Sequence, residues 1–385
     1  KVQQSAVVED LLKKMPGVEI DSDGKITVNG KEVKKMLVDG KEFFSDDPKV
    51  ASKNLPAAMV EKLQVVDRKS EMAQMTGFDD GNEETVINLS IRPGMKEGVF
   101  GNGFAGYGSK KRYDAGGMVN YMRNETQISA LGGINNTNNA GFSDFASNMF
   151  SGNRPSRGGM RFGANNGVAK TLNGGINFAT QYSDKLKYGG DVRYGTVDND
   201  VSSTSNRINT GLNQTEVSKS QGNNTSNNFG LNMRFEWTPD SLTTVIFSPS
   251  FQYNTNDNIQ SSVTDITNVS QRFGSSNNTN NYYSTGKGIS LSGNLDISRK
   301  LNSKGRVLSI GLTRGLSNSD SDGSNYIYSS YQYVDTSVQD SISSRDQIFT
   351  QDDKSYNWRV YLSYVEPLGR SNFLQLSYNI RNNNS

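Results

Sequence analysis

The chain lacks two of the residue types that most often carry chemistry. Its 385 residues include no cysteine and no histidine. Disulfides and thiolate nucleophiles are therefore excluded, as are the commonest general base and the imidazole ligands of zinc sites. Serine, aspartate and glutamate are plentiful, but no nucleophile, base and orienting group form a catalytic constellation. We therefore expect a protein that is not an enzyme and that carries no cofactor.

Two short acidic segments have the oxygen-rich composition of cation-binding loops. They span residues 21–24 and 79–82, and calcium prefers clustered oxygen ligands. Neither segment has the twelve-residue loop with a terminal glutamate, and Asp, Asn and Gly are also the usual residues of tight turns. Both are interpreted as turns, and no metal site is assigned.

Aromatic side chains supply the remaining candidates for ligand contacts. Tyr282 and Tyr283 form one pair, and tyrosines recur between Tyr326 and Tyr333. Such rings stack on sugars or aromatic ligands, but they are equally typical of the aromatic girdle or strand tops of a membrane barrel. The glycine-rich segment 98–108 lacks a phosphate-loop pattern and is interpreted as a strand. The sequence alone assigns no ligand-binding residue.

The composition of the chain limits the classes of protein to which it can belong. The formal net charge is +2, from 41 basic and 39 acidic residues, so no overall field favours nucleic acid as a partner. The mean hydropathy is −0.66, and no apolar run approaches the ~20 residues of a transmembrane helix. A membrane β-barrel fits this composition, because lipid-facing and lumen-facing residues alternate along its strands.

The beginning of the chain predicts a small α+β unit. Apolar residues from Val7 to Met15 recur at helical spacing, after a potential cap at Ser5 and before Pro16-Gly17. Short strands are expected on both sides of an Asn29-Gly30 turn, which suits a hairpin. A further strand is expected over Lys35 to Asp39.

A second helix is expected next. Apolar residues from Leu55 to Leu63 again follow a helical period, beginning near Pro56. Residues 64–66 are β-branched or polar and are interpreted as a strand.

From Gly98 onward the apolar residues recur with a period of two. Lys187, Asp191 and Arg193, for example, alternate with apolar neighbours, which predicts strands with one polar and one apolar face. Each strand is expected to have the ~9–11 residues that span a membrane. Arg314 falls on an apolar series, and we expect it at the outer membrane boundary, where its cost is small. About eleven strands are expected, beginning near Val99, Tyr113, Ile128, Val168, Leu186, Phe229, Thr243, Ile289, Val307, Tyr356 and Phe373.

The connections between these strands are alternately short and long. Short turns are expected at residues 123–124, 183–184, 239–240, 302–305 and 368–370, and long polar loops at 135–166, 201–225, 254–281 and 317–353. This segregation is typical of outer-membrane barrels and has no reason to occur in a soluble sandwich. Beside the short turns lie Tyr121, Tyr182, Trp237 and Tyr364. They are expected to form an interfacial girdle, although core packing also explains any single one.

Four segments of the first part also resemble a known family. They are EDLLKKMPGVEID, GKITVNGKEVKKMLVDGKEFF, LPAAMVEKLQVVD and GNEETVINLSIRPG. In this order they resemble the plug of TonB-dependent receptors, most closely the related outer-membrane β-barrel branch, over residues 5–94. The resemblance implies a plug-like domain over residues 1–95 and a partial outer-membrane β-barrel over 96–385. About 11 of about 22 strands would be present, with the plug in the barrel lumen.

This resemblance implies a function and a location. The chain would belong to an outer-membrane receptor that takes up a nutrient across the Gram-negative outer membrane. Its partners would be outer-membrane lipid, a small nutrient ligand, the TonB energy-coupling complex and a surface lipoprotein. The alternative is an outer-membrane protein that keeps the plug-like domain but acts in adhesion or assembly. Because the chain opens without a secretion signal and stops inside a polar run, we expect both ends to be cut.

Overall fold

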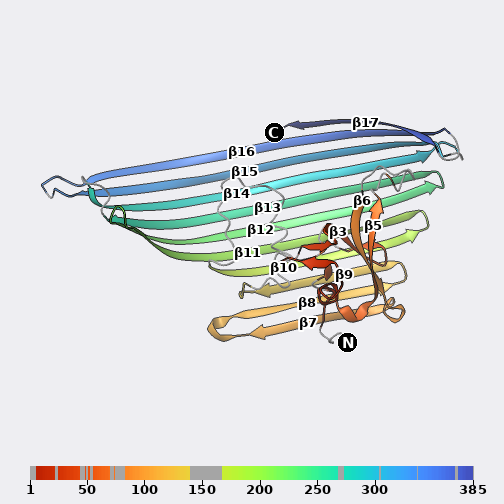
Figure 1. The fold of residues 1–385 in the computed structure, drawn as a ribbon, viewed down its shortest axis with the longest axis horizontal. Helices are drawn as coiled ribbons and strands as arrows, with labels where there is room; N and C mark the ends of the chain where they lie inside the picture. The colour runs from red at the N-terminus through yellow and green to blue at the C-terminus, as the bar shows by residue number, and fades with distance from the viewer. Residues whose placement is uncertain are drawn as a thin grey trace.

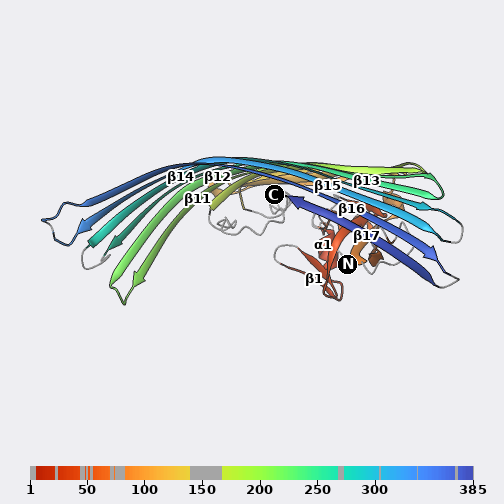
Figure 2. The same ribbon diagram turned by 90° about the horizontal axis from the view of Figure 1, so that it is seen from above.

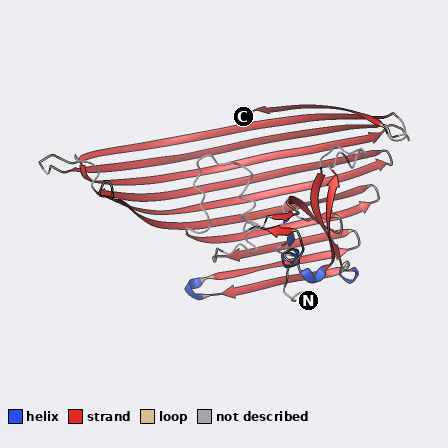
Figure 3. Cartoon of the chain, in the orientation of Figure 1, coloured by secondary structure: helices blue, strands red, loops and turns tan. Residues whose placement is uncertain are grey.

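The computed structural model contains two separate β-sheets (Figures 1 and 3). It describes residues 6–21, 25–43, 48, 51–52, 55–69, 73, 83–138, 167–267, 273–302, 305–335, 337–368 and 372–384. The predicted mainly β class is confirmed, because one sheet has eleven antiparallel strands and the other has six strands. Several segments interpreted in the sequence lie outside the described residues. They are Ser5, residues 22–24 and 79–82 of the expected turns, and residues 139–166 of the first expected loop.

The smaller sheet belongs to the N-terminal unit, which we define as residues 6–91. The unit contains helix α1 (Val8–Leu12), the 3-10 turn η1 (Ala57–Met59) and strands β1 (Val18–Ile20), β2 (Ile26–Val28), β3 (Lys31–Val38), β4 (Lys41–Glu42), β5 (Val60–Lys69) and β6 (Glu83–Ile91). The strand order is β1-β2-β3-β6-β5, with β4 paired to β3. The β3 and β6 strands run parallel. The apolar side chains of the unit form a core that includes Leu12, Phe43 and Leu89, each at most 1% exposed.

Two hairpin turns in this unit follow from residues that tolerate positive φ. Asn29 and Gly30 have φ values of 49° and 79°, and Asp39 and Gly40 have 46° and 78°. Positive φ at both central residues is the requirement of a type I′ hairpin. The predicted hairpin at Asn29-Gly30 and the strand before Asp39 are therefore confirmed.

The helices of the unit are shorter than predicted. The first ends at Leu12, although the expected pair of Glu9 and Lys13 is present, with Oε1 and Nζ 2.6 Å apart. The helix expected over residues 55–63 is wrong, because strand β5 begins at Val60. There Leu63 lies opposite Leu89 of β6, and this pairing overrides the local helical period. The strand expected at 64–66 is confirmed as part of β5.

The larger sheet is a succession of hairpins in which each strand pairs with the next along the chain. The turn η2 (Pro93–Met95) leads into it, and η3 (Ser109–Lys111) connects its first two strands. The strands are β7 (Gly98–Tyr107), β8 (Tyr113–Arg123), β9 (Thr126–Asn135), β10 (Gly167–Ser183), β11 (Leu186–Asn209), β12 (Gln214–Asp240), β13 (Thr243–Thr267), β14 (Phe273–Lys300), β15 (Val307–Tyr333), β16 (Ser341–Pro367) and β17 (Phe373–Asn384). The expected eleven strands are confirmed. The short turns expected at 123–124 and 183–184 are confirmed, and the one expected at 239–240 lies at 241–242. Residues 303–304 and 369–370 of the other two expected turns lie outside the described residues.

Most of these strands are longer than predicted. Strands β7, β8, β9 and β17 have 10 to 12 residues, as expected, but β11 to β16 have 24 to 28. The loops expected at 201–225, 254–281 and 317–353 are therefore wrong, since most of their residues continue the strands. Polar side chains support this extension by bonding across strands, as between Asn223 Nδ2 and Asp198 Oδ1 at 2.6 Å and between Ser226 Oγ and Asn256 Oδ1 at 2.7 Å.

The larger sheet is arched, and its two faces differ in polarity. Figure 2 shows the N-terminal unit on the inner side of the arch and the hairpin ends bending toward that same side. The outer face carries apolar rows that cross seven strands in register. One row is Leu186, Trp237, Val245, Ile297, Ile310, Leu362 and Tyr378, and the next is Tyr188, Phe235, Phe247, Leu295, Leu312, Val360 and Ile380. The inner face is mostly polar, so the predicted alternation is confirmed.

The predicted girdle positions also fall on this outer face, near the short turns. Tyr121, Tyr182 and Trp237 are 36%, 76% and 50% exposed, which contradicts core packing for these three. Arg314 is on the outer face as well, but its expected place at the edge of the apolar rows is wrong. It lies opposite Gly293, and the apolar row of Leu291 continues beyond it.

Candidate functional site

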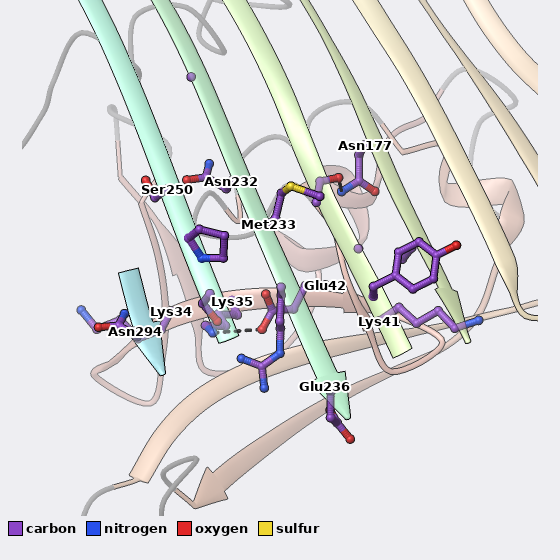
Figure 4. A pocket seen from close by; sticks show the side chains of 18 of the residues that line it. Lys34, Lys35, Lys41, Glu42, Asn177, Asn232, Met233, Glu236, Ser250 and Asn294 are labelled. Carbon is purple, nitrogen blue, oxygen red and sulfur yellow. Dashed lines mark hydrogen bonds and ion pairs between the residues drawn. The ribbon is translucent and has the colours of Figure 1, made fainter. Parts of the chain in front are cut away.

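A cavity of about 1140 Å³ lies between the N-terminal unit and the inner face of the larger sheet (Figure 4). On the unit's side it is lined by residues of β3 and β4, and on the other side by strands β10 to β16. Nine basic and five acidic side chains are among its lining residues. The cavity is therefore a polar, charged space with walls from both sheets.

The wall of the larger sheet is built from the polar series predicted in the sequence. Lys187 and Glu236 face each other on β11 and β12, with Nζ and Oε1 3.2 Å apart. Arg193 Nε donates to Asp191 Oδ2 at 2.6 Å, and the Asp191 side chain is fully buried. Asn232 Nδ2 also donates to this carboxylate, at 3.2 Å. A buried charge is tolerated only when it is paired and hydrogen-bonded, so these contacts hold the wall in one arrangement.

The wall of the N-terminal unit carries ion pairs of its own. Lys35 Nζ lies 3.0 Å from Glu42 Oε1, which joins β3 to β4. Lys34 and Lys25 both lie near Glu32, at 2.8 Å and 3.3 Å. The hydrogen bond from Lys34 holds the pKa of the Glu32 carboxyl below its usual range. The Glu32 carboxylate therefore remains charged near neutral pH and partly offsets the basic side chains around it.

One lysine ties the N-terminal unit directly to a short turn of the larger sheet. Lys41 Nζ donates to the Glu125 carbonyl oxygen at 2.7 Å and to Glu125 Oε2 at 2.9 Å. The hydrogen bond from Lys41 lowers the pKa of the Glu125 carboxyl. The pair therefore stabilises the contact above the carboxyl's unfolded pKa, and this contribution is lost as the pH falls through the lowered value. Because Glu125 is 61% exposed, the pair contributes only ~0–1 kcal/mol.

On its other side the N-terminal unit packs against the larger sheet through apolar side chains. Met118 and Met122 of β8 and Leu131 of β9 are 1%, 5% and 6% exposed, and they belong to the same buried cluster as the unit's core. Phe100 of β7 packs against this cluster. The unit therefore meets β7 to β9 through a dry apolar contact and faces β10 to β16 across the polar cavity.

A buried asparagine in the cavity wall has an acceptor without a hydrogen-bond partner among the described residues. Asn177 of β10 is 2% exposed and lines the cavity. Its Nδ2 donates to the Gly190 carbonyl at 3.3 Å, but within the described chain its Oδ1 has no hydrogen-bond partner. A buried polar atom without a partner costs ~1–3 kcal/mol, so this oxygen is suited to a water or a ligand donor. The sequence pattern gave no sign of this residue.

The tyrosines singled out in the sequence lie on the long hairpins, well away from this cavity. Tyr282 is on the inner face of β14, where its ring stacks on Phe349. Tyr283 and Tyr326 are 44% and 40% exposed on the outer face. The structure therefore separates the two members of the Tyr282-Tyr283 pair.

Neither a metal site nor a membrane-spanning helix is found in the described residues. No group of three or more Asp or Glu side chains there is arranged to hold a metal ion. No helix in the same ranges is long and apolar enough to cross a membrane.

No protein-family model matches the chain, and no curated protein matches it in sequence. Among solved structures it is similar to the siderophore receptor PiuA from Acinetobacter baumannii, the ferric-catecholate import receptor Fiu from E. coli K12 and the ferric yersiniabactin uptake receptor FyuA from Yersinia pestis. The identities are 10%, 10% and 11%, with TM-scores of 0.30, 0.28 and 0.26. The similarity covers 94%, 98% and 98% of this chain, and 62%, 86% and 65% of those chains. The chain thus spans less than two thirds of PiuA and of FyuA.

Proposed function

We propose that the chain is part of an outer-membrane uptake receptor of the TonB-dependent type. The N-terminal unit, up to about residue 95, would be its plug, and residues 96–385 would be part of its barrel wall. The observation that carries this proposal is the two-faced sheet, with apolar rows outside and a folded unit seated on a polar inner face (Figure 2).

The height of the apolar rows supports contact with lipid. On β14 the outward apolar series runs from Ile297 to Ile289, a rise of roughly 27 Å along the strand at ~3.4 Å per residue. Outer-membrane barrels carry an outward apolar band ~25 Å tall. Beyond Ile289 the outward residues are Lys287 and Thr285, so the polar hairpins would project from the membrane. The short turns would then lie in the periplasm and the long hairpins outside the cell.

The contacts of the N-terminal unit support a role as a gate. Its apolar side is packed against β7 to β9, whereas its charged side faces the cavity along β10 to β16. Charged and polar surfaces separate in water at a lower cost than apolar ones, which lose buried area. A path for the nutrient would therefore open on the cavity side. Energy from the TonB complex would drive this movement, and a role for a surface lipoprotein stays a prediction.

A reversible cross-link tests whether uptake requires this movement. Lys41, which lines the cavity, and Glu125 would both be replaced by cysteine in the full-length protein. Residues 1–385 contain no native cysteine, and any cysteine elsewhere in the protein would be replaced by serine in every variant. A cleavable bis-thiosulfonate reagent would then join the two cysteines, with a spacer about as long as the lysine side chain that was removed. In a strain lacking the gene, growth would be screened on single limiting sources of iron, cobalamin or carbohydrate. We expect the cross-linked protein to fail on the nutrient that requires the gene, and a reductant to restore growth.

The two single cysteine variants, treated with the same reagent, are the controls and should support normal growth. If the cross-linked protein supports growth as well as these controls, the gate is rejected. If loss of the gene impairs attachment or envelope assembly but the uptake of no nutrient, the alternative role in adhesion or assembly replaces the receptor.

A further inference from the structure

The inner face of the long hairpins is uncharged over two neighbouring rows. In register across β11 to β16, one row is Val201, Gly222, Gln260, Tyr282, Asn325 and Gln347, and the next is Asn199, Asn224, Asn258, Ser284, Gly323 and Phe349. Three of the six residues in each row have amide side chains. We call this surface the hairpin platform, and it differs from the charged cavity beside the N-terminal unit.

An aromatic pair lies at one side of the hairpin platform. The rings of Tyr282 on β14 and Phe349 on β16 are nearly parallel, at 19°, with centroids 6.0 Å apart. They meet across β15 because the intervening residue is Gly323. A Cβ atom there would lie 2.7 Å from Phe349 Cε1, so any other residue would displace the ring. The backbone and both side chains thus combine to place an aromatic pair on a mostly polar surface.

Hydrogen-bond acceptors beside these rings lack donors. The Oδ1 atoms of Asn280 and Asn325, and of Asn224 two strands away on β12, are buried and have no hydrogen-bond partner among the described residues. Asn325 lies directly opposite Tyr282, and Asn280 precedes Tyr282 by two residues on the same face of β14. Unsatisfied acceptors next to an apolar ring favour a ligand that offers hydroxyl donors beside a C–H face.

We infer that the hairpin platform binds a neutral saccharide. A pyranose ring stacks its C–H face on an aromatic side chain while its hydroxyls donate to amide oxygens, and both partners are present here. Both rows lack charge, and the adjacent row of Asn280 carries one charge, Arg345 on β16. A charged ligand over the two rings would therefore lose water without gaining a counter-charge in either row. This inference rests on the proposed uptake function and assigns the substrate class that the external hairpins would capture.

The test is glycan binding by the full-length protein, purified in detergent. An array of neutral oligosaccharides and their acidic counterparts would identify a bound glycan, and titration calorimetry would measure its affinity. We expect binding of neutral glycans, and an affinity at least tenfold weaker in Tyr282→Ala and in Phe349→Ala. Tyr282→Phe keeps the ring and should stay within a few-fold of the parent protein.

Tyr283→Ala is the matched control, since Tyr283 is the next residue on β14 and its ring is on the opposite face. It should bind as the parent does. Binding of no neutral glycan, or equal binding by Tyr282→Ala and Tyr283→Ala, would overturn the inference. An uptake defect in the cross-linking experiment without glycan binding rejects only the hairpin platform. Glycan binding without any uptake defect supports the platform and rejects the receptor function.

Discussion

Leu291→Arg is expected to prevent stable assembly of the protein in the outer membrane. Leu291 is on the outer face of β14, between Phe251 and Leu316, and is 49% exposed. Its replacement therefore disturbs little packing within the sheet, and the cost arises where the side chain would meet lipid. Leu291 lies between the centre of the Ile297 to Ile289 series and its outer end, so an arginine there costs an amount between the ~2–4 kcal/mol of the bilayer midplane and the ~0–1 kcal/mol of the boundary. The measurement is the yield of heat-modifiable protein in the outer-membrane fraction.

The adjacent variant Ser292→Arg is the control, because Ser292 faces inward and lines the polar cavity. It should assemble at a near-normal yield. The natural Arg314 is an exception among the apolar rows, but Gly293 beside it leaves room for its aliphatic part to extend toward the boundary. Leu291 has bulky neighbours on both sides and offers no such room. Equal yields of the two variants would contradict contact between the outer face and lipid.

Leu89→Ala is expected to destabilise the N-terminal unit. Leu89 is fully buried on β6, between Val38 of β3 and Leu63 of β5. Truncating a buried leucine costs ~2–5 kcal/mol, through lost burial and the cavity left behind. Limited trypsin digestion of the purified full-length protein should cut the unit roughly thirtyfold faster or more, which corresponds to ~2 kcal/mol when opening is reversible.

Val65→Ala provides the comparison, since Val65 lies on the neighbouring strand but is 37% exposed. Its digestion rate should rise by only a few-fold. If Leu89→Ala is digested no faster than Val65→Ala, the unit is not a separately cooperative element around this core.

Local patterns predicted the elements of the larger sheet and the direction of its side chains. Alternation around Lys187, Asp191 and Arg193 assigned the inner and outer faces correctly, because the pleat of a strand is a local property. The short turns were also predictable from polar breaks between apolar series. The lengths of the strands were not, since the apolar alternation stops near Ile289 while the backbone pairing continues to Phe273.

Contacts between residues far apart in the sequence could not be predicted from local patterns. Lys41 and Glu125 are 84 residues apart, and nothing around either residue predicts the other as its partner. The stack of Tyr282 on Phe349 depends on the registers of three strands and on the missing side chain at Gly323. The helix expected over 55–63 was wrong for the same reason, because the pairing of β5 with β6 is decided by tertiary structure.

Epitope insertion tests most directly whether the sheet crosses the outer membrane with its long hairpins outside. One tag would be placed between Gly211 and Leu212, at the tip of the β11–β12 hairpin, and another between Asp184 and Lys185, in a short turn. We expect antibody to label the first tag on intact cells and the second tag only after the outer membrane is permeabilised. Labelling of both tags on intact cells, or recovery of the protein in the soluble fraction, would contradict it.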